Sequence, residues 1–278
     1  MLSRINKKFI LLAIGVVILL VATFSFLIFW YFHVRGVSTN QITSNATSSS
    51  KPAATTTPTP SVKSPNQPIS DQPVFVGTPA EISWGNRNKK QVIFTFDGGS
   101  GSQSAQVILT TLGKYNVKGT FFLTGTWVNQ NQDLTRQLSQ KGYEIFNHTT
   151  THPHFTQISD TQIISELKGL NDIVYNLTGR STKPYFRPPY GERNAHVLDV
   201  AASQGYQSVY WTIDALDWKE STGTTAQQVH DRIMTNLKPG TIYLMHIGDN
   251  ITGQILDNVF NEIKAQGYTI VSLTEGIK

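Results

Sequence analysis

The residues of this chain that could carry out chemistry gather in five short motifs, each beside an apolar run. In chain order they are Phe94-Thr95-Phe96-Asp97-Gly98-Gly99, His148-Thr149-Thr150-Thr151-His152, Arg187-Pro188-Pro189-Tyr190-Gly191, Asp214-Ala215-Leu216-Asp217-Trp218 and Leu244-Met245-His246. They supply carboxylates, imidazoles and a guanidinium, which are groups that bind metals, transfer protons and grip anions. The motifs predict an active site assembled from distant parts of the sequence.

His148 and His152 are four residues apart, a spacing at which two imidazoles can share one metal ion. Because Pro153 disfavours helical geometry at His152, we expect a turn or loop there rather than the middle of a helix. The spacing alone is a weak signal, since ordinary polar positions show it too. Its place just after an apolar run favours the metal site.

Asp97 and His246 each follow an apolar, strand-like run. A carboxylate at the end of a buried strand is costly unless it has a partner or a task, but a turn or helix N-cap is an alternative for Asp97. His246 is either a hydrogen-bonded core residue or a catalytic acid, because an ordinary pKa near 6.5 lets it exchange protons at neutral pH. A serine nucleophile is disfavoured, since the chain has no Gly-x-Ser-x-Gly sequence.

Arg187 precedes two prolines, so it is either part of a structural turn or a rigidly presented guanidinium that grips a carboxylate. Asp217 and Trp218 are either a loop acid beside a core tryptophan or part of a surface on which a sugar stacks. The glycine-rich stretch after Asp97 lacks the Gly-Lys-Ser/Thr ending of a phosphate loop, which argues against a nucleotide ligand.

The part of the chain after residue 73 alternates apolar runs with amphipathic stretches. This pattern predicts strands at 92–96, 119–123, 143–146, 185–186, 208–212, 241–245 and 268–271, and helices near 104–114, 132–140, 160–177, 194–204, 225–236 and 254–266. Regular alternation indicates a parallel sheet with helical crossovers, and about seven units favour a closed or nearly closed α/β barrel. The motif residues lie at the carboxyl ends of these strands, where barrels of this kind carry their active sites.

The N-terminal part of the chain predicts a membrane anchor. Residues 9–32 contain no charged side chain, and as a helix they would reach roughly 36 Å, enough to span a bilayer. Arg4, Lys7 and Lys8 lie before this segment, which predicts a cytoplasmic N-terminus at 1–8 and an extracellular domain. A cleaved signal peptide is the alternative, but its apolar region is usually shorter, at about 7 to 15 residues.

Residues 33–73 are rich in Ser, Thr and Pro and predict a linker, so residues 74–278 form the predicted catalytic domain. The net charge of +5 comes from the first 73 residues, because acidic and basic residues balance in the rest. Nucleic acid is therefore not expected as a partner. The chain has no cysteine, which excludes disulfides and thiolate metal sites.

Together and in this order, the five motifs resemble the polysaccharide deacetylases with a NodB homology domain, carbohydrate esterase family 4. The resemblance extends from about residue 90 to residue 274. It implies a distorted (β/α)7-type barrel and a hydrolase that removes N-acetyl groups, or O-acetyl groups in some members, from a polysaccharide. With the predicted anchor, the implied protein is an extracellular enzyme of a bacterial cell membrane, in a Gram-positive envelope, acting on peptidoglycan N-acetylglucosamine.

The resemblance also implies a role for each catalytic residue. Asp97 corresponds to the catalytic base, and Arg187 to the residue that orients this base. His246 corresponds to the catalytic acid, and Asp217 to the residue that tunes the acid.

His148 and His152 correspond to the two metal-binding histidines. The implied cofactor is a divalent metal, with Zn²⁺ expected and Co²⁺ and Mn²⁺ as alternatives, that polarises the acetamide carbonyl and activates a bound water. Members of the family usually have a second Asp, a metal ligand, where this chain has Gly98. Three outcomes follow: two histidines and waters hold the metal, another carboxylate such as Asp97 substitutes, or catalysis is lost.

The implied substrate-binding residues are Tyr190, whose backbone N–H corresponds to an oxyanion donor, and Trp218 and Leu244, which correspond to groove walls. The expected partner is peptidoglycan or another N-acetylated cell-wall polysaccharide. Because of Gly98, the alternative function is a weakened or inactive module that only binds such a glycan.

Overall fold

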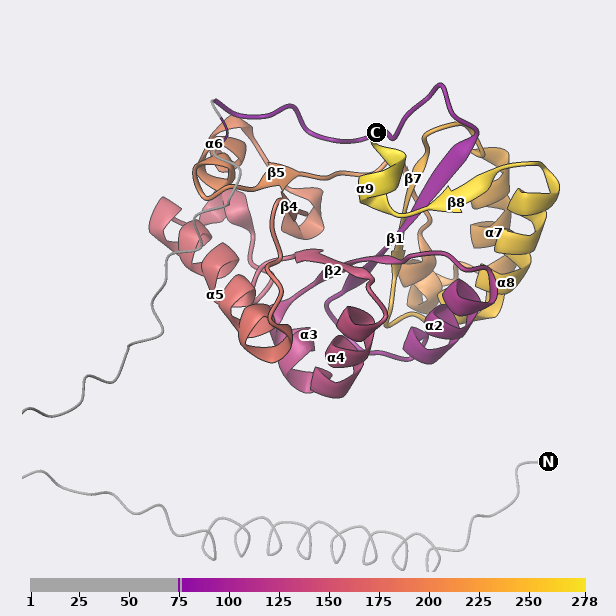
Figure 1. The fold of residues 1–278 in the computed structure, drawn as a ribbon, viewed down its shortest axis with the longest axis horizontal. Coiled ribbons are helices and arrows are strands. Elements are labelled where there is room, and N and C mark those ends of the chain that lie inside the picture. The colour runs from indigo at the N-terminus through magenta and orange to yellow at the C-terminus, as the bar shows by residue number, and fades with distance from the viewer. Residues whose placement is uncertain (1–74, 76) are drawn as a thin grey trace, which may run out of the picture. The chain divides into compact units, whose positions relative to one another are not determined.

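The apolar run that ends at Asp97 forms strand β1 (Gln91–Gly98), around which the fold is built. Every residue of β1 after Gln91 is buried. In the computed structural model, which describes residue 75 and residues 77–278, β1 pairs in parallel with β2 (Thr120–Leu123), β7 (Ile242–His246) and β8 (Thr269–Val271) (Figure 1). Both faces of this strand are covered, which explains why apolar residues occupy consecutive positions from Val92 to Phe94 instead of alternating with polar ones.

The remaining strands extend the sheet on both sides of β1. They are β3 (Glu144–Asn147), β4 (Tyr185–Phe186), β5 (Gln207–Ser208) and β6 (Ile213–Asp214), and the strand order is β5-β4-β3-β2-β1-β7-β6, with β8 attached to β1. All of the recorded strand pairs are parallel. The predicted parallel α/β architecture is confirmed.

The sheet curls into an open half-barrel and does not close. Within residues 77–278 no pairing joins β5 to β6. The edge of β5 is instead covered by the segment before β1: Ile82 forms a parallel bridge with Val209, and its N–H donates to the Ser208 carbonyl at 2.9 Å. The closed form of the barrel prediction is therefore wrong, because another segment satisfies the edge that closure would have paired.

Helices cover the outer face of the curled sheet (Figure 1). They are α2 (Ala105–Lys114), α3 (Gly125–Gln130), α4 (Gln132–Gln140), α5 (Asp160–Thr178), α6 (Ala195–Ser203), α7 (Ala226–Thr235) and α8 (Asn250–Ala265). The short helix α9 (Leu273–Gly276) packs on the inner side instead, where Leu273 lies with Ile93 and Phe122. The loops contain short 3-10 turns, η1 (Phe155–Gln157), η2 (Pro189–Gly191) and η3 (Asp217–Thr222). The six predicted helices are confirmed; α8 begins four residues earlier than predicted, and α3 and α9 were not predicted.

The sheet has one apolar layer on each of its two faces. Phe94 and Phe96 of β1 belong to the larger layer, between the sheet and the helices, whereas Ile93 packs with Phe122 and Val209 on the inner side of the curl. The direction of β1 side chains alternates as a strand requires. Asp97 therefore points to the inner side, toward the mouth of the half-barrel.

The register of the strands brings the distant motifs together at the carboxyl edge of the sheet. Asp97 of β1 is the direct partner of His246 of β7. Asn147 of β3 pairs with Phe186 of β4, so that His148 and Arg187 each follow one of these residues. Asp214 of β6 pairs with Leu244 of β7. Because parallel strands end at the same edge, all five motifs meet there by topology alone.

None of the helices within the described residues is long and apolar enough to cross a membrane. The predicted anchor at 9–32, the cytoplasmic segment at 1–8 and the linker at 33–73 lie outside those residues, and all three stay predictions.

Candidate active site

Asp97 is held at the floor of the site by Arg187. Its side chain is buried, and its Oδ1 accepts a hydrogen bond of 2.5 Å from Arg187 Nη1. Its other oxygen, Oδ2, lies 3.5 Å from Nε2 of His148. One carboxylate oxygen is thus fixed by a cation while the other faces the histidines, as a proton acceptor or a metal ligand requires.

Arg187 is fully buried, and every contact of its guanidinium restricts it. Its Nε and Nη2 donate to the carbonyls of Val209 and Tyr210, each at 3.2 Å, and the group lies 4.1 Å from the centre of the Phe122 ring. Burial lowers the pKa of Arg187, and the charge and hydrogen bond of Asp97 oppose this effect. The guanidinium has little freedom left, so it sets the orientation of Asp97.

His148 and His152 lie on a loop after β3, as the proline at 153 predicted, with their ring centres 4.7 Å apart. The loop is strained, because Thr149 and His152 have positive φ angles of 71° and 63°. Glu166 of α5 holds it: one carboxylate oxygen accepts from the Thr151 N–H and the other from the Thr151 hydroxyl, both at 2.7 Å.

The start of α5 fixes Glu166 in turn. Ser159 and Gln162 form a capping box, in which the Ser159 N–H donates to the Gln162 side chain at 2.9 Å. At Gly169 an added Cβ would lie 2.7 Å from the hydroxyl of Thr150. A glycine at this position lets α5 lie directly against the histidine loop.

The two imidazoles suit a divalent metal. Nδ1 of His148 lies 2.9 Å from the Arg187 carbonyl, which can only accept, so Nδ1 carries the proton and Nε2 offers a lone pair toward Asp97. Burial lowers the pKa of His148, and burial together with His148 lowers the pKa of His152 to about 4. Neutral imidazoles beside a carboxylate oxygen are a donor set that Zn²⁺, Co²⁺ or Mn²⁺ accepts.

Asp217 and His246 form a hydrogen-bonded pair on the opposite side of Asp97. Nδ1 of His246 donates to Asp217 Oδ1 at 2.9 Å, and the His246 N–H donates to Oδ2 at 2.7 Å. Burial by itself lowers the pKa of His246, but the hydrogen bond and charge of Asp217, with a contribution from Asp97, raise it to about 9. The imidazole therefore holds a proton at neutral pH and can deliver it.

Asp217, His246 and Asp249 could also be considered as metal ligands, because their donor atoms lie within 4.8 Å of one another. The hydrogen bonds argue against this. Besides the two bonds from His246, Asp217 accepts from the Trp218 N–H at 3.1 Å and from the Thr252 hydroxyl. With two bonds to each oxygen, Asp217 has no lone pair left for a cation, and a metal fits the His148–His152 side better.

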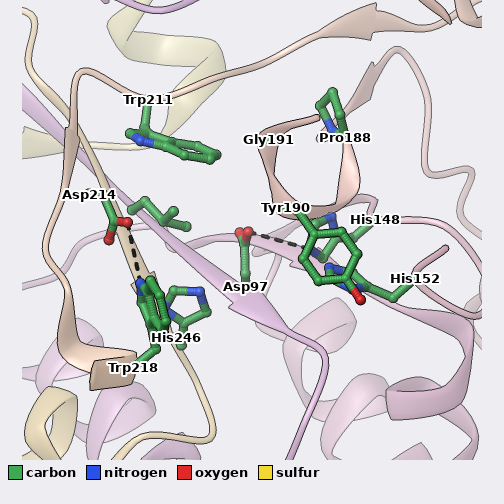
Figure 2. A pocket seen from close by; sticks show the side chains of 11 residues that line it. Asp97, His148, His152, Pro188, Tyr190, Gly191, Trp211, Asp214, Trp218 and His246 are labelled. Atoms are coloured by element: carbon green, nitrogen blue, oxygen red, sulfur yellow. Dashed lines mark hydrogen bonds and ion pairs between the residues drawn. The ribbon is translucent and has the colours of Figure 1, made fainter. Parts of the chain in front are cut away.

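These groups surround one open pocket of about 400 Å³. Figure 2 shows Asp97 at its centre, with His148, His152 and Tyr190 on one side and His246 and Trp218 on the other. Tyr190 and Trp218 are 61% and 46% exposed, unusual values for large aromatic side chains. A pocket with exposed rings on both walls suits a sugar, whose apolar face stacks on aromatic surfaces.

Comparison with known proteins identifies the family. A family model described as polysaccharide deacetylase matches residues 85–209. The peptidoglycan-N-acetylmuramic acid deacetylase PdaA of Bacillus subtilis is 35% identical over 191 residues, which cover 69% of this chain and 73% of that protein. The chain belongs to the polysaccharide deacetylase family. This confirms the resemblance derived from the five motifs, and with it the assignment to a family of hydrolases.

Relatives of this chain are described both as deacetylases and as a pseudoenzyme. A peptidoglycan-N-acetylglucosamine deacetylase of Bacillus cereus is 31% identical over 193 residues, covering 68% of this chain and 69% of that protein. The solved structure of BA3943 from Bacillus anthracis, described as a CE4 family pseudoenzyme, matches with a TM-score of 0.68 and 32% identity over 72% of this chain and 69% of that one. A BA3943 mutant described as having restored enzymatic activity matches equally well, with a TM-score of 0.68 and 33% identity over 72% of each chain.

Gly98 is the position at which this deacetylase family member departs from the expected motif. A Cβ at Gly98 would lie 2.7 Å from Cδ2 of Leu123, 3.0 Å from Cδ1 of Ile247 and 3.3 Å from the ring of Trp127. Position 98 thus faces the apolar layer between sheet and helices, opposite to Asp97. The neighbours of Gly98 fill the space in which a side chain would begin.

The structure brings together every site residue that the sequence predicted. Asp97, His148, His152, Tyr190, Trp218, Leu244 and His246 line the pocket, and Arg187 and Asp217 lie directly behind Asp97 and His246. Their roles are not tested by this placement.

Three further residues face the pocket: Asp214 and Pro188, which the sequence placed in the motifs without a role, and Trp211, which it did not single out. Asp214 accepts from the Trp218 indole N–H at 3.3 Å (Figure 2). It also accepts from the Leu216 N–H at 2.8 Å. Its presence in the same motif as Trp218 was the available signal. Trp211 gave none, because it lies at the end of a run that looks like an ordinary strand.

Proposed function

We propose that this chain is a metal-dependent deacetylase that hydrolyses the acetamide of N-acetylglucosamine units in cell-wall peptidoglycan. The observation that carries the proposal is the pairing of two oriented groups across one pocket. Asp97 is oriented by Arg187, and His246 is oriented by Asp217. A base and an acid held this way are what cleavage of an amide requires.

His148 and His152 would hold the metal, with Oδ2 of Asp97 beside them. When bound, the ion polarises the acetamide carbonyl and makes water a better nucleophile.

Asp97 acts as the general base. Arg187 occupies Oδ1, so the free Oδ2 takes the proton from the attacking water as the new C–O bond forms at the carbonyl carbon. The backbone N–H of Tyr190, at the rim of the pocket, donates to the oxyanion that develops.

His246 acts as the general acid. Its pKa of about 9 keeps it protonated at neutral pH, so it can give a proton to the nitrogen as the C–N bond breaks. Acetate and the free amine of the sugar are the products. Trp218 and Leu244 form the wall against which the sugar ring packs.

The second candidate function is a glycan-binding module without turnover. Gly98 favours it, because the expected carboxylate is absent and its space is filled by Leu123 and Trp127. The similarity to BA3943, which is described as a pseudoenzyme, favours it as well.

Acetate release separates the two functions. The full chain in detergent is incubated with N-acetylglucosamine oligomers and with purified peptidoglycan, each with added Zn²⁺, Co²⁺ or Mn²⁺ or with a chelator. We expect metal-dependent acetate release that is lost in His246→Ala and kept in His196→Ala, a change in a surface histidine that bonds Asp160. Saturable glycan binding without acetate in any metal would establish the binding module instead, and full activity of His246→Ala would remove the assignment of the acid.

We also propose that the protein is held in the bacterial cell membrane by residues 9–32, with the catalytic domain outside. The uncharged stretch and the basic residues before it support this topology. Protease treatment of intact cells should remove the catalytic domain and leave the N-terminus protected. Release of the protein into the medium with a new N-terminus after residue 32 would show a cleaved signal peptide.

A further inference from the structure

The ring of Tyr190 contacts two imidazoles from the histidine loop. Its centre is 4.4 Å from that of His152, with the planes at 66°, and 4.2 Å from that of His154, with the planes only 14° apart. The proposed catalytic role of Tyr190 uses its backbone N–H alone. The contacts of the ring need a separate explanation.

Tyr190 and His152, whose rings contact each other, both have strained backbones. Tyr190 has a φ angle of 57° and His152 one of 63°, in the left-handed region that side chains disfavour. Such conformations persist only where surrounding contacts fix them. Within the histidine loop the His152 N–H donates to the Thr149 hydroxyl at 3.0 Å, and the ring contact with Tyr190 adds support from a second loop.

His154 supplies this contact. Its ring stacks on that of Tyr190, and its Nδ1 lies 2.5 Å from Oε2 of Glu192, two residues after Tyr190. The side chain of Glu192 is 26% exposed and that of His154 48%. The pair therefore joins the histidine loop to the segment 187–192, which contains η2, at the rim of the pocket.

We propose that His154 is a positioning residue, which Glu192 fixes so that its ring clamps Tyr190 against His152. The clamp keeps the imidazole on the metal side and the N–H of Tyr190 in one fixed arrangement. This inference rests on the proposed function, in which His152 holds the metal and Tyr190 donates to the oxyanion. The geometry requires an aromatic ring at position 154, and the hydrogen bond to Glu192 sets its angle.

A simple surface pair is the alternative, and the chain contains one for comparison. His196 and Asp160 lie 2.7 Å apart, with side chains 65% and 57% exposed. Neither belongs to the pocket lining. His196→Ala therefore removes a histidine–carboxylate pair of the same kind without changing the clamp.

The test compares His154→Ala, His154→Phe and His196→Ala in the full chain in detergent micelles. The first readout is NMR of ¹³C-labelled histidine without metal, in which the ring protons of His152 report the nearby Tyr190 ring. The second is titration with Co²⁺, followed by its visible absorption. We expect His154→Ala to shift the His152 signals toward random-coil positions and to weaken Co²⁺ binding about tenfold, the lower end of what loss of a supporting contact costs a metal site.

His154→Phe keeps the stack and should restore the His152 shifts and most of the Co²⁺ affinity, while His196→Ala should match the unchanged protein. Unaltered His152 signals in His154→Ala would overturn the proposal, as would a loss in His154→Phe as large as that in His154→Ala. If no variant binds Co²⁺, the proposed metal-dependent function fails, and the His152 shifts still decide whether the clamp exists.

Discussion

Asp217→Asn tests the proposed acid most directly, because a single side chain controls the proton on His246. Asp217 accepts four hydrogen bonds, two of them from His246. Asparagine has no charge and only one acceptor oxygen, so it cannot satisfy all four donors. Burial, which lowers the pKa of His246, is then no longer offset by the charge and hydrogen bond of Asp217. We expect the pKa of His246 in the variant to fall from about 9 to its ordinary value or below.

The shift of His246 from an ordinary pKa of about 6.5 to about 9 corresponds to roughly 3 kcal/mol of interaction with the protonated form. Since the pKa is raised in the folded protein, this stabilisation is complete below about pH 6.5 and is lost as the pH rises through about 9. The free energy of unfolding of the unchanged protein should therefore decline between these pH values. In Asp217→Asn this decline with pH should disappear. The unsatisfied donors should lower the free energy of unfolding of the variant at every pH.

Two measurements follow the change. NMR titration of the His246 ring in metal-free protein gives the pKa, and urea unfolding near pH 6 and near pH 9.5 gives the linked stability. Near pH 7.5 the protonated fraction of His246 should drop from nearly all molecules to about a tenth. Acetate release at that pH should fall by about the same factor, and part of it should return at lower pH.

Asp249→Asn is the matched control, because Asp249 also raises the pKa of His246 but acts only through its charge. Its effect should be clearly smaller than that of Asp217→Asn. The reasoning is refuted if His246 still titrates near 9 after Asp217→Asn, or if the two variants shift it equally.

Two further predictions concern the residues around Asp97. Arg187→Met leaves the Asp97 carboxylate buried without its partner, and it should lower the free energy of unfolding, measured with urea, by about 3–5 kcal/mol. The double variant that also carries Asp97→Asn should recover part of this loss. Equal stability of Arg187→Met and the unchanged protein would contradict this. Gly98→Asp forces a side chain against Leu123 and should cost about 1–3 kcal/mol, seen as a lower Tm. In a double-mutant cycle, Gly98→Asp should cost less in a chain that carries Leu123→Ala than in the unchanged chain. A Tm that is unchanged by Gly98→Asp alone would show that position 98 is not crowded.

The sequence predicted the site well where chemistry and strand ends coincide. Asp97, His148 and Arg187 each follow a buried run, and parallel strands carry such residues to one edge. The capping box at Ser159 was also predictable, because both of its bonds lie within four residues. Local rules were sufficient for these features.

Features that depend on contacts between loops could not be predicted. The stack of His154 on Tyr190 joins residues 36 positions apart, and neither residue type announces it. The open edge of the sheet depends on Ile82 covering β5, which no periodic pattern signals. The direction of position 98 follows from the alternation along β1, but the crowding by Trp127 needs α3, a short helix that the pattern missed.

Because Asp97 of β1 and His246 of β7 are direct strand partners, the backbone fixes the distance between these two residues. Neighbouring strands lie about 4.8 Å apart, and hydrogen bonds along both strands keep that spacing. The loops that carry Tyr190 and Trp218 can therefore change to fit a different ligand while the proposed proton acceptor and donor keep their separation. Deleting one residue within β7 would turn His246 to the opposite face of the sheet. The strand pairing therefore keeps the site constant when the loops vary, but a shift of register by one residue would remove His246 from it.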